Sequence, residues 1–477
     1  MRSWKRRSRR IWRGWVMAFN DPVVRLGDYV EACLGKMLDA QKNRGAFQPY
    51  LGNSNVRWGA FDLQDLAVMR FEQQEEERYG LRDGDLVVCE GGEPGRCAIW
   101  QGEVPNMKIQ KALHRIRVKS GLDNYFLYYW FLHAGKTGAL EPYFTGTTIK
   151  HLTGKALAEL KIPLPPIERQ RGLAKVLRSL DDKIDLNRRI NQTLEAMAQA
   201  IFNSWFVNFD PVKAKIAAIE QGQDPLRAAM RAISGKTDAE LDQMLREHHD
   251  QLAATAALFP DAMEESESWE IPKGWEVSTI GEMVEIAGGA TPDTKNESYW
   301  NPPEYFWTSP KDLSGAQSPV LLTTERKIST AGLSRIGSGL LPKGTLLMSS
   351  RAPIGYLAIT QIPVAINQGY IAMLPGGKLP PLYLLMWCQQ NMEEIKGQAN
   401  GSTFMEISKK AFRPMLVINP GSVVLDRFIE TVAPLFERLA EGVKASSQLA
   451  ELRDTLLPKL LSGELRVPDA ECSMEEV

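Results

Sequence analysis

The chain has 477 residues, of which 44% are hydrophobic, with 57 lysines and arginines against 58 aspartates and glutamates. This length suggests about three domains, and the near-zero net charge excludes a globally basic nucleic-acid-binding protein, so that phosphates would have to meet local basic patches. The longest apolar runs, such as YFLYYWFL at 125–132 and PLYLLMW at 381–387, are far shorter than the roughly 20 residues of a membrane helix, and we expect buried helices there.

The N-terminal segment, residues 1–22, opens with MRSWKRRSRRIWR, in which seven residues are basic and none is acidic. The apolar run that would follow in an export signal is missing. Two interpretations remain open: a flexible basic tail able to touch nucleic acid, or a translation start at Met17.

Two stretches of the chain repeat one pattern, because GTTIKHLTGKAL begins at Gly146 and GSTFMEISKKAF begins at Gly401, 255 residues later. Self-similarity at a fixed offset indicates duplicated structural units. Nearly the same offset relates three further pairs of stretches: 160–166 with 415–421, 84–99 with 344–359, and 24–35 with 277–289. We therefore predict two copies of one unit, residues 23–166 (the first copy) and residues 269–421 (the second copy).

Within each copy, apolar alternation such as LVVCE and TLLMSS is interrupted by Gly and Pro turns and by short helical runs. This pattern predicts a mixed sheet trimmed with helices.

A long helix follows each copy, at 167–209 and at 422–465, and its apolar residues alternate spacings of four and three. Such spacing is typical of a coiled-coil seam. The predicted seam residues are Leu173, Leu177, Leu180, Ile184, Asn187, Asn191, Leu194 and Ile201 in the first helix and Phe428, Val432, Leu435, Leu439, Leu449 and Leu456 in the second. At the middle of both seams, polar or small residues replace the apolar ones. We therefore expect the helices to pair in one register; the alternative is that each helix packs on its own copy.

Between the first helix and the second copy lies an insert, residues 210–268, that is rich in alanine and becomes acidic toward EESESWE. We expect a solvated helical connector, with a dedicated binding element as the alternative. Residues 466–477 form a C-terminal tail.

The five cysteines are odd in number, lack CxxC spacing and have no companion histidine cluster; they are Cys33, Cys89, Cys97, Cys388 and Cys472. This pattern argues against a disulfide framework or a zinc site and fits a reducing cytoplasm.

The order of two variable units, each followed by a long helix, resembles the specificity (S) subunit of type I restriction-modification enzymes. The stretches that carry the resemblance are KIPLPPIERQ running into LDDKIDLNRRINQTLEAMAQAIFNSWFVNFDPV, EIPKGWEVSTIGEM, LPKGTLLMSSRAPIGYLAI and GSTFMEISKKAF. Together they are specific, and the resemblance covers nearly the whole chain beyond the basic tail.

The resemblance implies an α+β fold with two tandem mixed α/β target recognition domains, whose long helices pair as an antiparallel, pseudo-two-fold coiled coil. It implies a non-catalytic, cytoplasmic subunit that recognises a bipartite, asymmetric target in double-stranded DNA, one half-site per domain. The implied partners are methyltransferase (modification) subunits, expected to be two, and restriction (motor and nuclease) subunits. S-adenosylmethionine, ATP and magnesium are then expected in those partners and not in this chain.

Side chains that read base edges are Arg, Asn, Gln, Ser, Thr and Lys, and we expect them in loops. The DNA-binding candidates are Arg96, Thr147, Thr148, Lys150 and Lys155 in the first copy and Ser350, Arg351, Asn367, Gln368, Ser402, Thr403, Lys409 and Lys410 in the second. A turn or helix-cap role is the alternative for Thr147 and Ser402. Lys409 and Lys410 are expected to meet phosphates, which position a protein without specifying sequence.

Enzyme patterns occur only in part. The Gly-Lys-Thr at Gly135 and at Gly235 lacks the glycine that a phosphate loop needs five residues earlier, where Trp130 and Met230 stand. Nucleotide binding is therefore not predicted.

Two further patterns fail in the second copy. The NPPE stretch at Asn301 resembles the Asn-Pro-Pro-aromatic element of adenine methyltransferases but has Glu304 in the aromatic position. Asp293 with Glu325 and Lys327 imitates a metal-dependent nuclease, and we interpret the last two as surface residues. We predict no catalytic or metal-binding residue; a self-sufficient DNA nuclease or methyltransferase, and a coiled-coil scaffold, are the alternatives.

Overall fold

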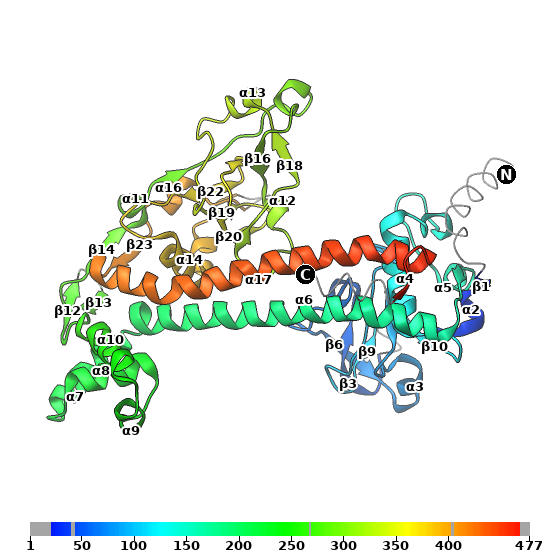
Figure 1. Ribbon diagram of the computed structural model, residues 1–477, viewed down its shortest axis with the longest axis horizontal. Helices are drawn as coiled ribbons and strands as arrows, with labels where there is room; N and C mark the ends of the chain where they lie inside the picture. The colour runs from blue at the N-terminus through cyan, green and yellow to red at the C-terminus, as the bar shows by residue number, and fades with distance from the viewer. Residues whose placement is uncertain (1–20, 40–42, 267–268, 402–404, 468–477) are drawn as a thin grey trace. The chain divides into compact units, whose positions relative to one another are not determined.

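The computed structural model describes residues 21–39, 43–266, 269–401 and 405–467 (Figure 1). The chain divides into two compact units, the first unit of residues 1–184 and 448–477 and the second unit of residues 185–447. The basic tail, apart from its last two residues, and the C-terminal tail from residue 468 lie outside the described residues.

The first unit contains a four-stranded antiparallel sheet with strand order β2-β10-β7-β8 and a three-stranded sheet with order β6-β3-β9. Its strands are β1 (Val23–Arg25), β2 (Val30–Leu34), β3 (Ala46–Leu51), β4 (Val56–Arg57), β5 (Ala60–Phe61), β6 (Val68–Phe71), β7 (Leu86–Cys89), β8 (Cys97–Ile99), β9 (Lys108–Ile109), β10 (Leu113–Val118) and β11 (Lys161–Pro163). Strand β1 pairs with β11, so that the beginning and the end of the first copy are joined.

The second unit contains the corresponding sheets, with orders β15-β22-β19-β20-β17 and β18-β16-β21. Its strands are β14 (Glu276–Thr279), β15 (Ile286–Ala287), β16 (Tyr305–Thr308), β17 (Val320–Leu321), β18 (Arg326–Ile328), β19 (Leu346–Ser350), β20 (Ile354–Thr360), β21 (Ala365–Ile366), β22 (Tyr370–Met373) and β23 (Leu416–Asn419). Here β14 pairs with β23.

The two copies share the order of their main strands. In each three-stranded sheet the central strand has one antiparallel and one parallel neighbour, β6 and β9 for β3 and β18 and β21 for β16. The larger sheets differ by β17, which adds a parallel edge strand to the second one. The duplication predicted from the repeated sequence is confirmed as a duplicated fold.

The two apolar runs form helices, as predicted. Helix α4 (Asn124–Thr137) begins where the Asp123 side chain accepts the Phe126 amide hydrogen at 2.9 Å, and it ends at Gly138, whose φ of 72° a side chain would strain. Helix α14 (Pro381–Gln390) starts with a proline at its first position. Both bury most of their side chains in the cores of their units.

The long helices are α6 (Ile167–Phe202) and α17 (Ser422–Ser462), and each contributes to both units. In the first unit, Leu173 and Leu177 from the beginning of α6 share a core with Leu456 and Leu460 from the end of α17. In the second unit, the Phe202 ring at the end of α6 lies 6.1 Å from that of Phe428 near the start of α17. The antiparallel pairing is therefore confirmed.

All of the predicted seam residues are buried or half-buried. Those that are at least nine-tenths buried are Leu173, Leu177, Leu180, Asn191, Phe428, Val432, Leu439, Leu449 and Leu456. Those that are half-buried are Ile184, Asn187, Leu194, Ile201 and Leu435.

The insert folds into four helices and is more closely packed than the solvated connector we predicted. Its elements are α7 (Asp210–Glu220), α8 (Pro225–Ser234), α9 (Asp238–Asp242), α10 (Arg246–Ala257) and β12 (Met263–Ser266), which pairs with β13 (Trp269–Pro272). Val212 and Phe259 are buried in the core of the second unit, where the Phe259 ring lies 5.1 Å from that of Trp205. The correction follows from these apolar anchors, which the overall alanine and acidic composition concealed.

Candidate nucleic-acid interface

The first copy of the repeated stretch forms a closed loop. Thr145 and His151 exchange two backbone hydrogen bonds, at 2.9 and 2.8 Å, and so close residues 145–151 (the first loop). Gly146 adopts a φ of 94°, and a β-carbon there would lie 2.2 Å from the Ile149 carbonyl oxygen. The tight turn therefore requires the glycine. Residues 146–150 are all exposed.

The second copy closes its stretch in the same way. Asn400 and Glu406 exchange two backbone hydrogen bonds, at 3.0 and 3.1 Å, and bracket residues 400–406 (the second loop). Gly401 adopts a φ of 132°. Residues 402–404, which include the candidates Ser402 and Thr403, lie outside the described residues.

In both copies, the residue that follows the closing hydrogen bonds of the loop is itself hydrogen-bonded to the end of an equivalent strand. The Leu152 amide donates to the Glu90 carbonyl oxygen at 2.7 Å, and the Ile407 amide donates to the Ser350 carbonyl oxygen at 3.0 Å. Glu90 follows β7 and Ser350 ends β19. The repeated stretch thus stands beside the β7–β8 turn in the first copy and the β19–β20 turn in the second.

A third turn joins the same surface in both copies. The Glu90 amide donates to the Ala112 carbonyl oxygen, and the Ser350 amide donates to that of Gly369, each at 2.8 Å. Ala112 lies between β9 and β10, and Gly369 lies between β21 and β22. Three chain segments therefore converge on one polar edge in each copy.

His114 on β10 contacts the residue that directly follows the first loop. Its Nε2 lies 3.0 Å from the Leu152 carbonyl oxygen, which can only accept, so Nε2 carries the proton. Burial lowers the pKa of His114, with the hydrogen bond to Leu152 opposing this effect. The imidazole is neutral at physiological pH and acts as a structural donor.

The loops lead into short helices capped by equivalent residues. Thr153 accepts the Ala156 amide hydrogen at 3.3 Å before α5 (Gly154–Ala158), and Ser408 accepts that of Ala411 at 3.1 Å before α16 (Lys409–Phe412). The capping oxygen in the first copy therefore belongs to Thr153 and not to Thr147, for which a cap was the alternative.

Several candidates are placed where they can contact a ligand. Thr147, Thr148, Lys155, Lys409 and Lys410 are exposed on or directly after the loops. Lys150 is also exposed, with its Nζ 3.9 Å from a Glu141 carboxylate oxygen and 5.9 Å from the centre of the Phe144 ring. Such an exposed ion pair is weak and leaves the ammonium free to exchange partners.

Other candidates are engaged within the protein. Only 18% of the Arg96 side chain is exposed, and its guanidinium donates to a Glu93 carboxylate oxygen at 3.2 Å and to the Asn53 carbonyl oxygen at 3.0 Å. Ser350 is 3% exposed. Both side chains are therefore mostly covered in this conformation, and their contact with DNA stays a prediction.

The side chains of three further candidates at the same edge, Arg351, Asn367 and Gln368, each make a contact within the protein but are not fully covered. The Arg351 guanidinium lies 3.6 Å from a Glu406 carboxylate oxygen and remains 37% exposed. The Asn367 side-chain oxygen accepts the Gly369 amide hydrogen at 2.8 Å. The exposed Gln368 accepts from the Thr291 hydroxyl at 2.7 Å, leaving its amide nitrogen available.

Three residues at these edges are not among the candidates predicted from the sequence: Lys111, Thr291 and Glu406. Lys111 is exposed in the β9–β10 turn, at the place of Gln368 in the second copy. The sequence did contain a signal for Lys111. The distance in sequence from Lys111 to Gln368 is only two residues longer than the distance that separates the two loops. Thr291 carries no such signal, since the stretch around it has no counterpart of clear register.

The carboxylates of the enzyme-like patterns make local contacts within the protein. The Glu325 carboxylate pairs with Lys311 at 2.8 Å, and Asp293 accepts the backbone amide hydrogen of Lys295 at 3.0 Å. Glu304 accepts from Thr330 at 2.7 Å. Within the described ranges, no cluster of three His, Cys, Asp or Glu side chains could hold a metal ion.

Known proteins similar to this chain share one description. The model of the type I restriction modification DNA specificity domain matches residues 22–196 and 272–420. The HindI specificity subunit of a type I restriction enzyme from Haemophilus influenzae is 32% identical over 333 residues, which are 67% of this chain and 72% of that protein. The MjaIX specificity subunit from Methanocaldococcus jannaschii is 25% identical over 76% of this chain and 74% of its own length.

Among solved structures, the S subunit of a type I restriction-modification system from M. genitalium is similar with a TM-score of 0.48 and 16% identity, covering 93% of this chain and 96% of that one. Among the described residues, no helix is both long enough and apolar enough to cross a membrane.

Proposed function

Because the chain belongs to the family of type I restriction-modification DNA specificity subunits, we propose that each of its copies reads one half of a bipartite, asymmetric DNA target. The observation that carries this proposal is the closed loop that occurs in both copies, attached to equivalent strands by equivalent backbone hydrogen bonds. Equivalent surfaces suit two half-sites, as they do in dimeric DNA-binding proteins.

The two loops are closed by the same backbone bonds but differ in sequence. Residues 147–150 are Thr-Thr-Ile-Lys, and residues 402–405 are Ser-Thr-Phe-Met. Because base edges are distinguished by the donors and acceptors of side chains, different side chains on one scaffold read different bases. The two half-sites should therefore differ, with an unread gap between them.

The chain would act by directing partner subunits. We assign methyl transfer from S-adenosylmethionine to two modification subunits, and ATP- and magnesium-dependent cleavage to restriction subunits. Support comes from the family to which the chain belongs. The paired helices α6 and α17 would form the surface on which the modification subunits dock.

The test is to express the chain with its modification partner in a host that lacks other methyltransferases and to map methylated adenines across the genome. We expect a single motif of two different defined half-sites separated by undefined bases. A continuous or palindromic motif would contradict the proposal. Methylation or cleavage by the purified chain alone would instead favour a self-sufficient enzyme, and a lack of sequence-specific DNA binding would favour a scaffold.

A further inference from the structure

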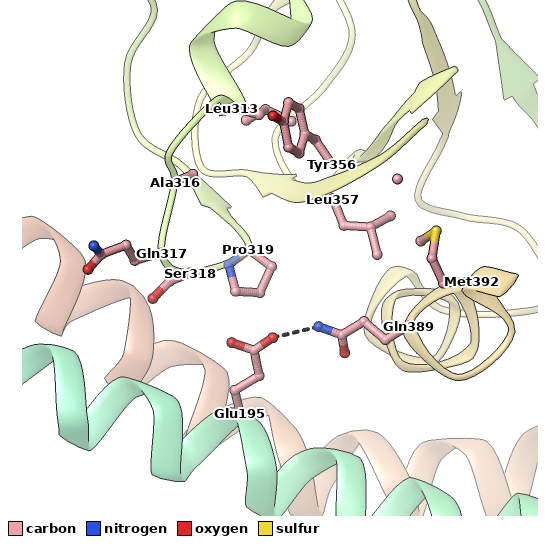
Figure 2. Close-up of a pocket in the computed structure, with 11 residues that line it drawn as sticks. Glu195, Leu313, Ala316, Gln317, Ser318, Pro319, Tyr356, Leu357, Gln389 and Met392 are labelled. Carbon is pink, nitrogen blue, oxygen red and sulfur yellow. Dashed lines mark hydrogen bonds between the residues drawn. The ribbon is translucent and has the colours of Figure 1, made fainter. Parts of the chain in front are cut away.

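A cavity of about 350 Å³ opens in the second unit (Figure 2). Its floor is formed by Glu195 of helix α6, and its walls come from residues 316–319, from β20 and from the end of α14 with the following helix α15 (Met392–Gly397). Figure 2 shows the Glu195 carboxyl group and the Gln389 amide facing each other across the floor.

Glu195 is a half-buried carboxylate without a counter-charge. Its hydrogen bond comes from the neutral Gln389 amide nitrogen, at 2.5 Å. Among the described residues, the neutral Gln389 side chain is the only polar group that acts on its ionisation, and no charged side chain does. Burial raises the pKa of Glu195, and the bond from Gln389 opposes that effect only in part. A partly buried carboxylate without a counter-charge is stabilised by any cation that enters the cavity.

Gln389 supplies a second acceptor beside the carboxylate. Its side-chain oxygen is buried and has no hydrogen-bond partner within the described structure. Such an acceptor costs free energy unless a donor reaches it. The cavity is therefore lined by an anionic acceptor whose hydrogen bond comes from a neutral donor, and by a neutral acceptor that has no donor among the described residues.

From this pairing we infer that the cavity binds a guanidinium group, either the side chain of a partner's arginine or a small guanidino compound. A guanidinium offers several N–H donors in one plane together with a positive charge, which matches a carboxylate that lacks a counter-charge and a neighbouring side chain whose amide oxygen lacks a donor. The apolar stem of such a ligand would lie along Pro319, Leu357 and Met392, which line the cavity.

The test uses the full chain and N-acetyl-arginine amide, with N-acetyl-citrulline amide as a neutral analogue of the same shape. Binding is followed by NMR of the Met392 methyl group, assigned with a Met392→Leu variant. We expect the arginine analogue to shift this signal and to bind about tenfold or more tighter than the citrulline analogue, as hydrogen bonds to charged groups typically allow.

Glu195→Gln should abolish this preference while the chain stays folded, because the substitution keeps the shape and removes a partly buried charge. The matched control is Glu393→Gln, which removes a charge beside Met392 from a side chain that is 89% exposed and does not line the cavity. The control should retain the preference. Equal binding of the two analogues, or a preference that survives Glu195→Gln, would overturn the proposal.

A second arm distinguishes the source of the guanidinium and does not depend on DNA reading. If a partner's arginine occupies the cavity, assembly with the modification subunit should shift the Met392 signal and exclude the arginine analogue. If the ligand is a small molecule, the assembled complex should still bind the analogue with its preference over citrulline. A complex that neither shifts the signal nor binds the analogue would contradict both forms.

Discussion

Asn191 and Gly442 fit each other at the polar centre of the paired helices. Asn191 is 3% exposed, and a β-carbon at Gly442 would lie 2.4 Å from its side-chain oxygen. A bulky buried amide on α6 is thus accommodated because α17 has no side chain at that point. Polar or undersized positions in a seam are known to fix helix register at some expense of stability.

The first prediction is that the effect of Gly442→Ala depends on Asn191. In the native chain the added methyl group overpacks the seam, and we expect a loss of about 1 to 3 kcal/mol. In an Asn191→Ala background the space is free, so the same substitution should stabilise the helix by up to about 1 kcal/mol. Calorimetric unfolding of the four variants measures this coupling. A loss of equal size in both backgrounds would mean that the two residues do not interact.

The second prediction concerns Asp181, which joins α6, α17 and α4 within the first unit. Its carboxylate accepts from the Tyr129 hydroxyl and from the Arg453 guanidinium, both at 2.7 Å. Burial and the neighbouring carboxylate raise the pKa of Tyr129, which therefore remains a donor. Because the Asp181 and Arg453 side chains are 23% and 16% exposed, Asp181→Ala should cost about 2 kcal/mol, less than for a fully buried pair.

The control for this prediction is Asp182→Ala. That side chain is 66% exposed and lies 3.8 Å from Arg178, so its loss should change the free energy of unfolding by less than about 1 kcal/mol. If the two alanine variants unfolded at the same temperature, the buried network would contribute nothing.

The sequence predicted those features that depend on periodicity or repetition. Heptad spacing located α6 and α17, and the shared register of Gly146 and Gly401 located the two loops. It could not predict which candidate side chains face solvent, because this depends on contacts between distant segments. Arg96 is covered through Asn53, 43 residues earlier, and Ser350 is buried beside Ile407, whose amide bonds to its carbonyl oxygen.

The third prediction is a pH dependence set by Glu195. Burial raises its pKa above the ordinary value of 4.5, so the folded chain keeps this proton to a higher pH than the unfolded chain does. Its contribution to the free energy of unfolding is therefore full below pH 4.5 and is lost as pH rises through the raised folded-state pKa. Glu195→Gln should remove this slope.

The measurement is the difference in unfolding temperature between the native chain and Glu195→Gln across roughly pH 5 to 8. We expect the variant to gain relative stability as pH rises. A difference that stays constant over this range would show that the carboxyl group titrates as it does in water.

The fourth prediction separates phosphate contacts from base readout. Lys409 and Lys410 are exposed at the start of α16, directly after the second loop. Replacing either by alanine should weaken DNA binding for all sequences alike. The slope of log K against log salt concentration should fall by about 0.9 for each phosphate that the protein no longer neutralises.

Lys343→Ala is the matched control, since this exposed lysine precedes β19 while the loop contact lies at Ser350, where that strand ends. Binding of specific and non-specific duplexes by fluorescence anisotropy at several salt concentrations provides the data. If Lys343→Ala and Lys409→Ala reduced the salt slope equally, the second loop would not mark the DNA-binding edge.

The most direct test of the central claim is methylation mapping of two loop variants assembled with the modification partner. One carries Thr147→Ala and Thr148→Ala in the first loop, and the other carries Ser402→Ala and Thr403→Ala in the second. Removing a base-specific hydrogen bond costs about 1 to 3 kcal/mol at one position, so each variant should relax one half-site and leave the other unchanged. Relaxation of both half-sites by either variant, or an unchanged motif in both, would contradict the assignment of one half-site to each copy.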